Sequence, residues 1–223
     1  MKISNLIKNF DKFSLNIKSL ELPEGKIYGL IGPNGCGKST AMKLMAGVIQ
    51  PHSGTIDYEG LIPRDITMVL RKPYLLHDTV LRNLIYPLKL RKITPDTDVI
   101  EHYLSITGLQ HYRNDYALTL SGGEQQKLAL IRALIFSPKM IFVDEAFSNM
   151  DIESVAFFEN YILKKQKEHP ITWVIISHQL SNIKRLCDYT FFMHNGEIAA
   201  SGNTGDLLSN PEGDELKQYL HHL

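Results

Sequence analysis

Cysteine, tryptophan and net charge are all scarce in this sequence. Its 223 residues include two cysteines and one tryptophan, and 24 Lys and Arg residues balance 24 Asp and Glu residues. Cys36 and Cys187 lie far apart with no metal-ligand spacing around them, which argues against a disulfide framework or a zinc site and predicts two reduced thiols in a cytosolic protein. The balanced charge argues against general attraction to nucleic acid or anionic lipid, so we expect no nucleic-acid partner.

Long apolar runs are missing as well. Polar residues interrupt the N-terminal segment Met1–Phe10 every few positions, unlike a secretory signal. The most apolar segments, such as Ile141–Val143 and Trp173–Ile176, have the length of a strand and not the roughly 18 residues of a spanning helix. We therefore expect a soluble chain that reaches a membrane only through a partner. With 43% hydrophobic residues, the chain is long enough for one large domain with a substantial interior.

Short apolar runs alternate with amphipathic segments in both halves of the chain. Lys26–Ile31 predicts a strand that enters a glycine-rich turn, and Ser39–Val48 predicts the helix that follows it. Met140–Val143 and Ile171–Ile176 predict two buried strands, with a helix at Val155–Lys165 between them. Strands that alternate with helices indicate an α/β fold with a mostly parallel sheet.

The strand pattern fades in the middle of the chain. We predict one domain over residues 1–223, with an α/β nucleotide-binding core in residues 1–71 and 138–223 and an inserted helical subdomain in residues 72–137. Near the end, Asn195–Gly196 lies between two apolar segments and predicts a β-hairpin turn. The helices predicted in the insertion are Val80–Leu90, Val99–Thr107 and Gly122–Phe136.

The glycine-rich stretch Gly32–Thr40 fits the pattern G-x-x-x-x-G-K-[ST] and lies between a predicted strand and a predicted helix. An ordinary glycine turn would need neither the Lys-Ser pair nor the preceding strand. Gly35 and Gly37 lack Cβ atoms, so backbone N–H groups can approach phosphate oxygens at the positive end of the helix. Lys38 supplies a charge for the β- and γ-phosphates, and Ser39 supplies a hydroxyl for Mg²⁺. The residues predicted to bind ATP here are Asn34, Gly35, Cys36, Gly37, Lys38, Ser39 and Thr40.

Two adjacent carboxylates, Asp144 and Glu145, end the predicted strand that begins at Met140. Because parallel strands end at one edge of a sheet, Asp144 can reach the Mg²⁺ held by Ser39. Glu145 is then free to orient or deprotonate a water, which is the general-base role in hydrolysis. A strand that ends in Asp-Glu is by itself as often the start of a helix cap, and the upstream glycine-rich stretch favours the functional interpretation.

The segment Leu120–Gln126 introduces the last helix of the predicted insertion. Ser121 and Glu124 form a capping box, which would account for this start without any ligand. A capping box does not explain Gly122 and Gly123, each of which costs roughly 1 kcal/mol relative to alanine within a helix. A helix N-terminus with a serine hydroxyl and bare amides is a second phosphate-binding surface.

With these motifs in this order over about Phe10 to Ala200, the sequence resembles the nucleotide-binding subunits of ATP-binding cassette (ABC) transporters. The resemblance implies a P-loop NTPase core with an N-terminal antiparallel β element. It also implies that Ser121, Gly122 and Gly123 contact the γ-phosphate held by a second copy of the chain. Two ATP molecules would then lie within a head-to-tail dimer.

The resemblance assigns further roles to single residues. It implies that His178, which follows the predicted strand ending at Ile176, holds the γ-phosphate and acts in catalysis with Lys38 and Glu145. It also implies that Ser148–Asp151 communicates across the dimer, with Asp151 near the nucleotide. The remaining assignment is adenine stacking by Phe10, for which Phe13 is the alternative.

One position departs from the family pattern. Members usually carry a glutamine at the junction between the core and the helical subdomain, where it contacts Mg²⁺ and the attacking water and senses the membrane partner. Arg71 stands there in this sequence, and no glutamine occurs between Gln50 and Gln110. Arginine has only donors, so it cannot ligate a metal, but it can contact a phosphate oxygen or pair with a carboxylate. We predict that hydrolysis persists through Glu145 and His178 while the coupling contact is altered.

The resemblance implies an ATPase subunit that drives a separate transmembrane permease from the cytoplasm, on the inner face of the cell membrane. A separate membrane polypeptide favours a prokaryotic importer, in which a solute-binding protein is a further component. The segments Lys72–Leu76 and Tyr86–Leu90 resemble tungstate-type oxyanion importers. Two alternatives stay open: a non-transport ABC ATPase, and a regulatory ABC ATPase that binds ATP and dimerises with little hydrolysis. Paired cassettes, coiled coils or basic surfaces would favour the first, and only Arg71 supports the second.

Overall fold

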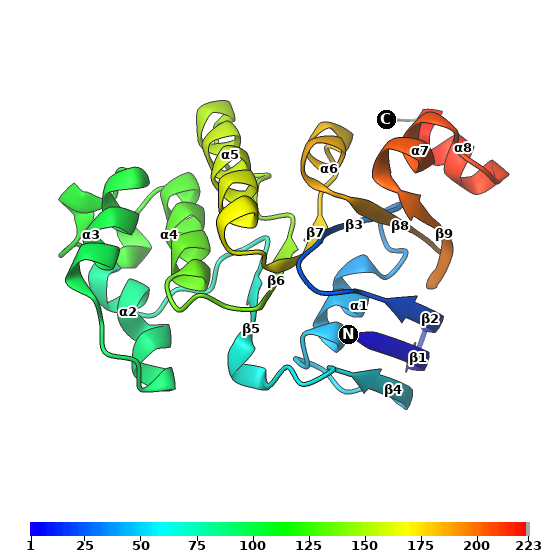
Figure 1. The fold of residues 1–223 in the computed structure, drawn as a ribbon, viewed down its shortest axis with the longest axis horizontal. Helices are drawn as coiled ribbons and strands as arrows, with labels where there is room; N and C mark the ends of the chain where they lie inside the picture. Colours follow the sequence, from blue (N-terminus) through cyan, green and yellow to red (C-terminus); the bar gives the residue numbers. More distant parts are fainter. Residues whose placement is uncertain (222–223) are drawn as a thin grey trace.

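The computed structural model describes residues 1–221 as two sheets surrounded by helices (Figure 1). Its strands are β1 (Lys2–Phe10), β2 (Phe13–Glu21), β3 (Ile27–Ile31), β4 (Ser53–Asp57), β5 (Ile66–Val69), β6 (Met140–Asp144), β7 (Thr172–Ile176), β8 (Tyr189–His194) and β9 (Glu197–Asn203). Its α-helices are α1 (Lys38–Met45), α2 (Val80–Arg91), α3 (Thr97–Ile106), α4 (Gly122–Leu134), α5 (Ile152–Glu168), α6 (Leu180–Leu186), α7 (Thr204–Ser209) and α8 (Asp214–His221). Short 3₁₀ helices lie at Pro63–Asp65, Gln110–Tyr112 and Ala117–Thr119.

The larger sheet has the strand order β5-β6-β7-β3-β8-β9. Strands β5, β6, β7, β3 and β8 run parallel, and β9 pairs with β8 in the antiparallel direction. The smaller sheet has the order β2-β1-β4, and both of its pairings are antiparallel. The predicted α/β class with a mostly parallel sheet and an N-terminal antiparallel element is therefore confirmed.

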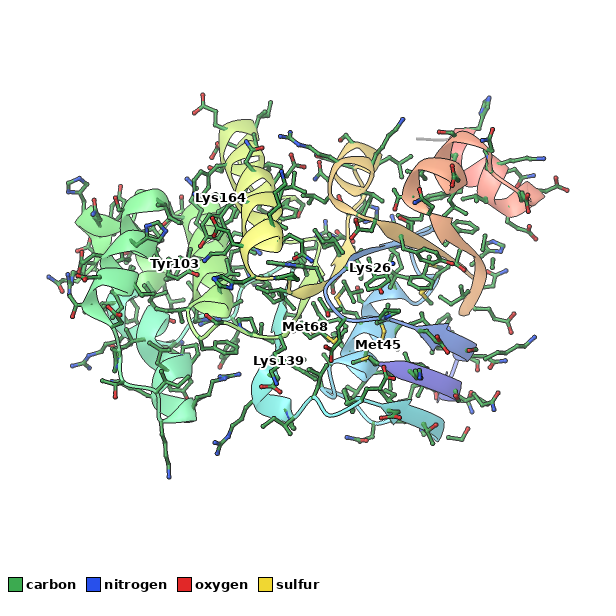
Figure 2. All side chains as sticks on the ribbon, viewed as in Figure 1. Lys26, Met45, Met68, Tyr103, Lys139 and Lys164 are labelled. Carbon is green, nitrogen blue, oxygen red and sulfur yellow. The ribbon has the colours of Figure 1, made fainter. Side chains whose placement is uncertain are left out.

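The central strands are buried on both faces. Ile141 of β6 packs into a hydrophobic cluster with α4, α5 and α6, whereas its neighbour Phe142 packs into a second cluster with α1 and the N-terminal strands. Met45 of α1 and Met68 of β5 also pack in this second cluster (Figure 2). Because neither face meets water, β3, β6 and β7 are buried at every position, and full burial of one side chain such as Phe142 is worth about 1.5–3 kcal/mol.

Helices α2, α3 and α4 lie together at the end of the molecule furthest from β1, β2 and β4 (Figure 1). The three helices predicted in the insertion are confirmed, but α4 ends at Leu134 and not at Phe136, because Ser137 takes a left-handed φ of 52° before Pro138. The predicted division into a core and an inserted subdomain stays a prediction. Among residues 1–221, no helix is long and apolar enough to cross a membrane.

The predicted hairpin between β8 and β9 turns at Asn195 and Gly196, with φ values of 47° and 83°. The backbone of Gly196 joins three parts of the fold. Its N–H donates a hydrogen bond to the carbonyl oxygen of Cys36 (3.0 Å), and its own carbonyl accepts one from the N–H of Asn16 (2.8 Å). A Cβ atom at position 196 would lie 2.1 Å from the carbonyl oxygen of Ser14. Only glycine fits this turn without displacing the backbone of β2.

Candidate active site

The residues that end four neighbouring parallel strands meet at one edge of the larger sheet. Arg71 comes shortly after β5, Glu145 directly after β6, and His178 shortly after β7, while β3 leads into the phosphate loop, defined as Gly32–Thr40. Parallel strands present their carboxyl ends at the same edge, which is where open α/β sheets bind ligands. The parallel pairing of β6 with β7 brings His178 to the same sheet edge as Asp144.

The phosphate loop curls around the ammonium group of Lys38. Lys38 is only 6% exposed, and its Nζ donates hydrogen bonds to the carbonyl oxygens of Gly32 (2.7 Å) and Pro33 (3.0 Å). Positive charge is thus held beside the N-terminus of α1, where a helix favours anions. The loop opens on a cavity of about 260 Å³ that is lined by Phe13, Asn34, Gly35, Gly37, Lys38, Ser39, Thr40 and Glu145.

Two glycines of the phosphate loop lie close to neighbouring atoms. A Cβ atom at Gly32 would lie 2.1 Å from the carbonyl oxygen of Met193, and one at Gly37 would lie 2.6 Å from the ring of Phe13. Gly35 differs, because a Cβ atom there would meet nothing within 4 Å, although its φ of +80° suits glycine. Gly35 therefore leaves an open approach to the loop backbone.

Cys36 turns its side chain away from the cavity and into the core, where it is 4% exposed. Burial raises the pKa of this thiol, and the neighbouring charge of Lys38 opposes the rise. Any contact of Cys36 with a nucleotide would therefore be made by its backbone. Its predicted part in ATP binding stays a prediction.

Two hard oxygen donors meet beside the loop. The Ser39 hydroxyl donates a 3.1 Å hydrogen bond to Oδ1 of Asp144. Burial raises the pKa of Asp144, and the Ser39 hydrogen bond opposes this rise. No group of three or more His, Cys, Asp or Glu side chains suited to a metal occurs among residues 1–221. A protein usually supplies Mg²⁺ with only one or two oxygen ligands, while waters and phosphate oxygens supply the rest. The oxygens of Ser39 and Asp144 match that protein contribution.

Glu145 stands in a backbone conformation that is rare for its residue type, with φ at 51°. Contacts on both sides hold this conformation. Its N–H donates to the carbonyl oxygen of Ile176 (3.1 Å), and its carbonyl oxygen accepts from the N–H (3.2 Å) and the hydroxyl (2.9 Å) of Ser148. Strained residues of this kind persist where the surroundings fix them, and they cluster at functional sites.

The Glu145 carboxylate lies between two nitrogen-bearing side chains. Nε2 of His178 is 2.7 Å from Oε1, and Nη1 of Arg71 is 3.2 Å from Oε2. The Arg71 contact is short enough for an ion pair but is not aligned as a hydrogen bond. Buried Oε2 accordingly has no hydrogen-bond partner among residues 1–221. The Glu145 side chain is 10% exposed, whereas the Arg71 side chain is 65% exposed. The arginine at the family's glutamine position therefore faces the predicted general base.

The signature segment, defined as Ser121–Gly123, begins α4 with the predicted capping box. The Ser121 hydroxyl accepts a hydrogen bond from the N–H of Glu124 (3.4 Å), and the Glu124 carboxylate accepts one from the N–H of Ser121 (2.9 Å). A Cβ atom at Gly122 would meet nothing within 4 Å, and one at Gly123 would lie 3.4 Å from the carbonyl oxygen of Asn149. The signature segment does not line the cavity at the phosphate loop.

Asp151 caps α5 in this structure. Its carboxylate accepts hydrogen bonds from the N–H and the hydroxyl of Ser154, both at 2.7 Å, and these hydrogen bonds lower the pKa of Asp151. Ser148, at the start of the same loop, holds the carbonyl of Glu145. The loop Ser148–Asp151 thus connects the predicted general base to α5, while its part in communication across a dimer stays a prediction.

Phe13 lies beside the phosphate loop. Its ring contacts Gly37 and lines the cavity, whereas Phe10 is 49% exposed with its ring centroid 6.3 Å from that of Phe13. Adenine stacking by Phe10, with Phe13 as the alternative, stays a prediction.

Comparison with known proteins places these features in a family. The family described as ABC transporter matches residues 15–148. This chain belongs to the ABC transporter family. The matches confirm its recognition as an importer-type nucleotide-binding subunit, and they support ATP binding and hydrolysis as its activity.

Three relatives illustrate the match. The chain is 34% identical over 203 residues to the tungstate uptake system ATP-binding protein TupC of Peptoclostridium acidaminophilum, covering 88% of this chain and 95% of TupC. It is 30% identical to the molybdate/tungstate import ATP-binding protein WtpC of Pyrococcus horikoshii, covering 99% of this chain and 67% of WtpC. It is 34% identical to the methionine import ATP-binding protein MetN 1 of Acinetobacter baylyi, covering 86% of this chain and 58% of that protein.

A solved structure confirms the P-loop ATPase fold. The chain superimposes on the dimeric, post-hydrolysis ATP-binding cassette MJ0796 bound to ADP and phosphate with a TM-score of 0.80. The match covers 91% of this chain and 98% of MJ0796 at 23% identity.

One hydrogen bond beside the site was not predicted from the sequence. Nε2 of Gln126, a fully buried residue of α4, donates a 3.1 Å hydrogen bond to the carbonyl oxygen of Leu70. Leu70 directly precedes Arg71, so the signature helix is tied to the segment that faces Glu145. The only signal in the sequence is a polar residue on the apolar side of an amphipathic helix.

Proposed function

We propose that this ABC ATPase energises import through a separate membrane permease, with one nucleotide held between two copies of the chain at each of two sites. The observation that carries the proposal is the meeting of the phosphate loop, Asp144, Glu145 and His178 at one sheet edge. The relatives TupC, WtpC and MetN 1 are named as uptake or import ATP-binding proteins, which supports the importer role.

The residues at the sheet edge suit hydrolysis of ATP. Lys38 and the loop amides would bind the β- and γ-phosphates, and the Ser39 and Asp144 oxygens would hold Mg²⁺, which when bound neutralises charge on the phosphates. Glu145 would take a proton from the attacking water, and His178, which contacts the same carboxylate, would hold the γ-phosphate. Because Glu145 is nearly buried, its carboxylate keeps one orientation toward the reacting atoms.

The glycines of the signature segment support the proposal that a second copy of the chain completes the site. The space around Gly122 is open, so nothing within the chain itself requires a glycine there. A glycine that costs roughly 1 kcal/mol in a helix without an internal reason points to contact with another molecule. We therefore place Ser121, Gly122 and Gly123 against the γ-phosphate bound by a partner copy, and the solved structure of MJ0796 is likewise dimeric.

A groove between β5, α2 and α4 is the candidate docking surface for the permease. It encloses about 380 Å³ and combines exposed apolar side chains with two arginines. Tyr74 is 76% exposed and Leu90 is 59% exposed, while the Arg91 guanidinium lies 3.5 Å from the centre of the Phe136 ring. Arg132 donates to the carbonyl oxygen of Tyr74 (2.6 Å). This surface fits an amphipathic segment with an acidic residue, and it adjoins Arg71.

Docking at this groove would put the chain on the cytoplasmic face of a membrane. Residues 72–137 would then be the subdomain that contacts the permease. For the transported substrate we propose a tungstate-type oxyanion, because TupC and WtpC are named for that cargo. Methionine is the competing substrate, since MetN 1 is named for it. Transport of radiolabelled tungstate and methionine by the reconstituted complex would separate the two.

Substitution of Glu145 tests the catalytic assignment. Glu145→Gln is expected to bind ATP normally and to lose about 10²–10⁴-fold in turnover, since a general base contributes that much. Glu24→Gln is the matched control, because Glu24 is an exposed carboxylate just before β3, at the opposite edge of the sheet. Turnover in Glu145→Gln equal to that of the wild type would contradict the assignment.

Two exposed apolar positions of equal exposure test the docking surface. Leu90→Glu (59% exposed) lies in the groove, and Val48→Glu (61% exposed) lies outside it. Leu90→Glu is expected to release the subunit from the permease in detergent, whereas Val48→Glu should stay bound. Retention of both variants would place the permease elsewhere.

A further inference from the structure

Two side chains lie against the Glu145 carboxylate that is proposed as the general base. Both of its oxygens face nitrogen atoms, with His178 at 2.7 Å from Oε1 and Arg71 at 3.2 Å from Oε2. A general base needs a free lone pair directed at the water whose proton it takes. Of the two contacts, the one with Arg71 directs a permanent positive charge at Oε2, because arginine keeps its proton.

We propose that Arg71 is a positioning residue that restrains Glu145, so that the isolated subunit hydrolyses ATP slowly until Arg71 moves away. This inference rests on the proposed function, because it assumes that Glu145 is the base. The ion pair holds the guanidinium 3.2 Å from Oε2, where it crowds the approach of a water to this oxygen. Arg71 thus takes part in control of the reaction from the position where relatives of this family usually carry a neutral glutamine.

The buried half of this pair is fixed and the exposed half is free to move. The Glu145 backbone is held by Ile176 and Ser148, whereas the Arg71 side chain is 65% exposed on a long, flexible stem. A pair with one solvated partner is weak, at about 0.2–1 kcal/mol, so a shift of the segment that carries Arg71 can break it.

Helix α4 is hydrogen-bonded to the backbone of the residue that precedes Arg71. Gln126 of α4 is fully buried and holds the carbonyl of Leu70 at 3.1 Å, one residue before Arg71. A shift of α4 against the sheet would therefore pull the Arg71 backbone with it. The groove proposed for the permease is lined by Leu70 and by residues of α4, so movement there reaches the same segment. Release of Glu145 is thus linked to docking and to closure of the dimer.

The test compares four variants in the isolated subunit and in liposomes with the permease. Arg71→Ala removes the charge, Arg71→Gln removes the charge and restores the usual family residue, and Arg71→Lys keeps the charge. Lys72→Gln is the matched control, since Lys72 is the adjacent exposed cation. We expect Arg71→Ala and Arg71→Gln to raise turnover of the isolated subunit about two- to fivefold. Arg71→Lys and Lys72→Gln should stay close to the wild type.

Two further readouts separate restraint from a merely structural effect. As salt screens the exposed ion pair, the ratio of Arg71→Ala turnover to wild-type turnover should fall towards one. In liposomes, the stimulation by the permease should be smaller for Arg71→Ala than for the wild type, because the restraint is already absent.

Three outcomes would overturn the proposal. A rise in Arg71→Gln alone would show that the restored glutamine, and not the loss of charge, is responsible. Unchanged or reduced turnover in Arg71→Ala beside an active wild type would overturn the restraint while leaving the ATPase assignment intact. No turnover in any variant, with or without the permease, would overturn both the restraint and the proposed hydrolytic mechanism.

Discussion

Alanine at position 196 tests how far the phosphate loop depends on the hairpin turn between β8 and β9. Gly196 has a φ of +83°, and its Cβ atom would lie 2.1 Å from the carbonyl oxygen of Ser14. Gly60 has a similar φ of +89°, but a Cβ atom there would meet nothing within 4 Å. The pair Gly196→Ala and Gly60→Ala therefore shares the backbone strain and differs in steric overlap.

The expected losses of stability follow from these contacts. A left-handed conformation costs an alanine about 1 kcal/mol, so Gly60→Ala should lower the free energy of unfolding by about that amount. In Gly196→Ala the overlap with backbone adds about 1–3 kcal/mol, and a weakened hydrogen bond to Cys36 or Asn16 adds up to about 1 kcal/mol. The total expected for Gly196→Ala is about 2–5 kcal/mol.

Urea unfolding followed by tryptophan fluorescence measures this difference, because Trp173 is the sole tryptophan and is 1% exposed. Titration with a fluorescent ATP analogue adds a functional readout. Gly196→Ala should weaken nucleotide binding about fivefold or more through the lost support of Cys36, while Gly60→Ala should bind as the wild type does. Equal destabilisation of the two variants, or wild-type affinity in a folded Gly196→Ala protein, would refute the reasoning.

Two further predictions concern the start of α4. Gly122→Ala should raise the stability of the isolated subunit by about 0.5–1 kcal/mol, because alanine favours the helix and its Cβ atom meets nothing there. The same variant should weaken ATP-dependent dimerisation in size-exclusion chromatography. Dimerisation like that of the wild type would contradict the proposed interface. Hydrogen bonds from Ser121 lower the pKa of Glu124 below its ordinary 4.5, so its contribution is present above that value and is lost as pH falls through the lower folded pKa. In urea unfolding the wild type should therefore exceed Glu124→Ala by about 1 kcal/mol at neutral pH, and by progressively less as the pH falls below 4.5. A pH-independent difference would argue against the carboxylate.

The buried strands were the most predictable elements. Strand β6 was predicted at Met140–Val143 and runs from Met140 to Asp144, and β7 was predicted to start at Ile171 and starts at Thr172. Both strands are covered on two faces, so their sequences are continuous apolar runs with clear ends. The contact of Ser39 with Asp144 was predictable too, because parallel strands end at one edge.

Elements with weak local patterns were not predictable. Strand β4 (Ser53–Asp57) is mostly exposed, and its pairing with β1 leaves no alternation of apolar and polar residues to identify it. Helix α1 was predicted to reach Val48 and ends at Met45, because Gly47 takes a left-handed φ of 71°. Pairing of Arg71 with a carboxylate was a possibility from sequence, but its partner Glu145 follows a different strand, and no local pattern encodes how the two side chains are oriented.

The left-handed backbone of Glu145 has a consequence for how mutations at this position would be tolerated. A residue such as asparagine enters this conformation at lower cost than glutamate, which carries about 1 kcal/mol of strain there. Of the two contacts that the carboxylate makes, the ion pair with Arg71 contributes only about 0.2–1 kcal/mol, since the arginine side chain is 65% exposed. Replacement of Glu145 by asparagine should therefore change the free energy of unfolding little beyond the loss of the His178 contact. We therefore expect a subunit inactivated by asparagine at this site to fold as the active one does and to compete with it for the same permease.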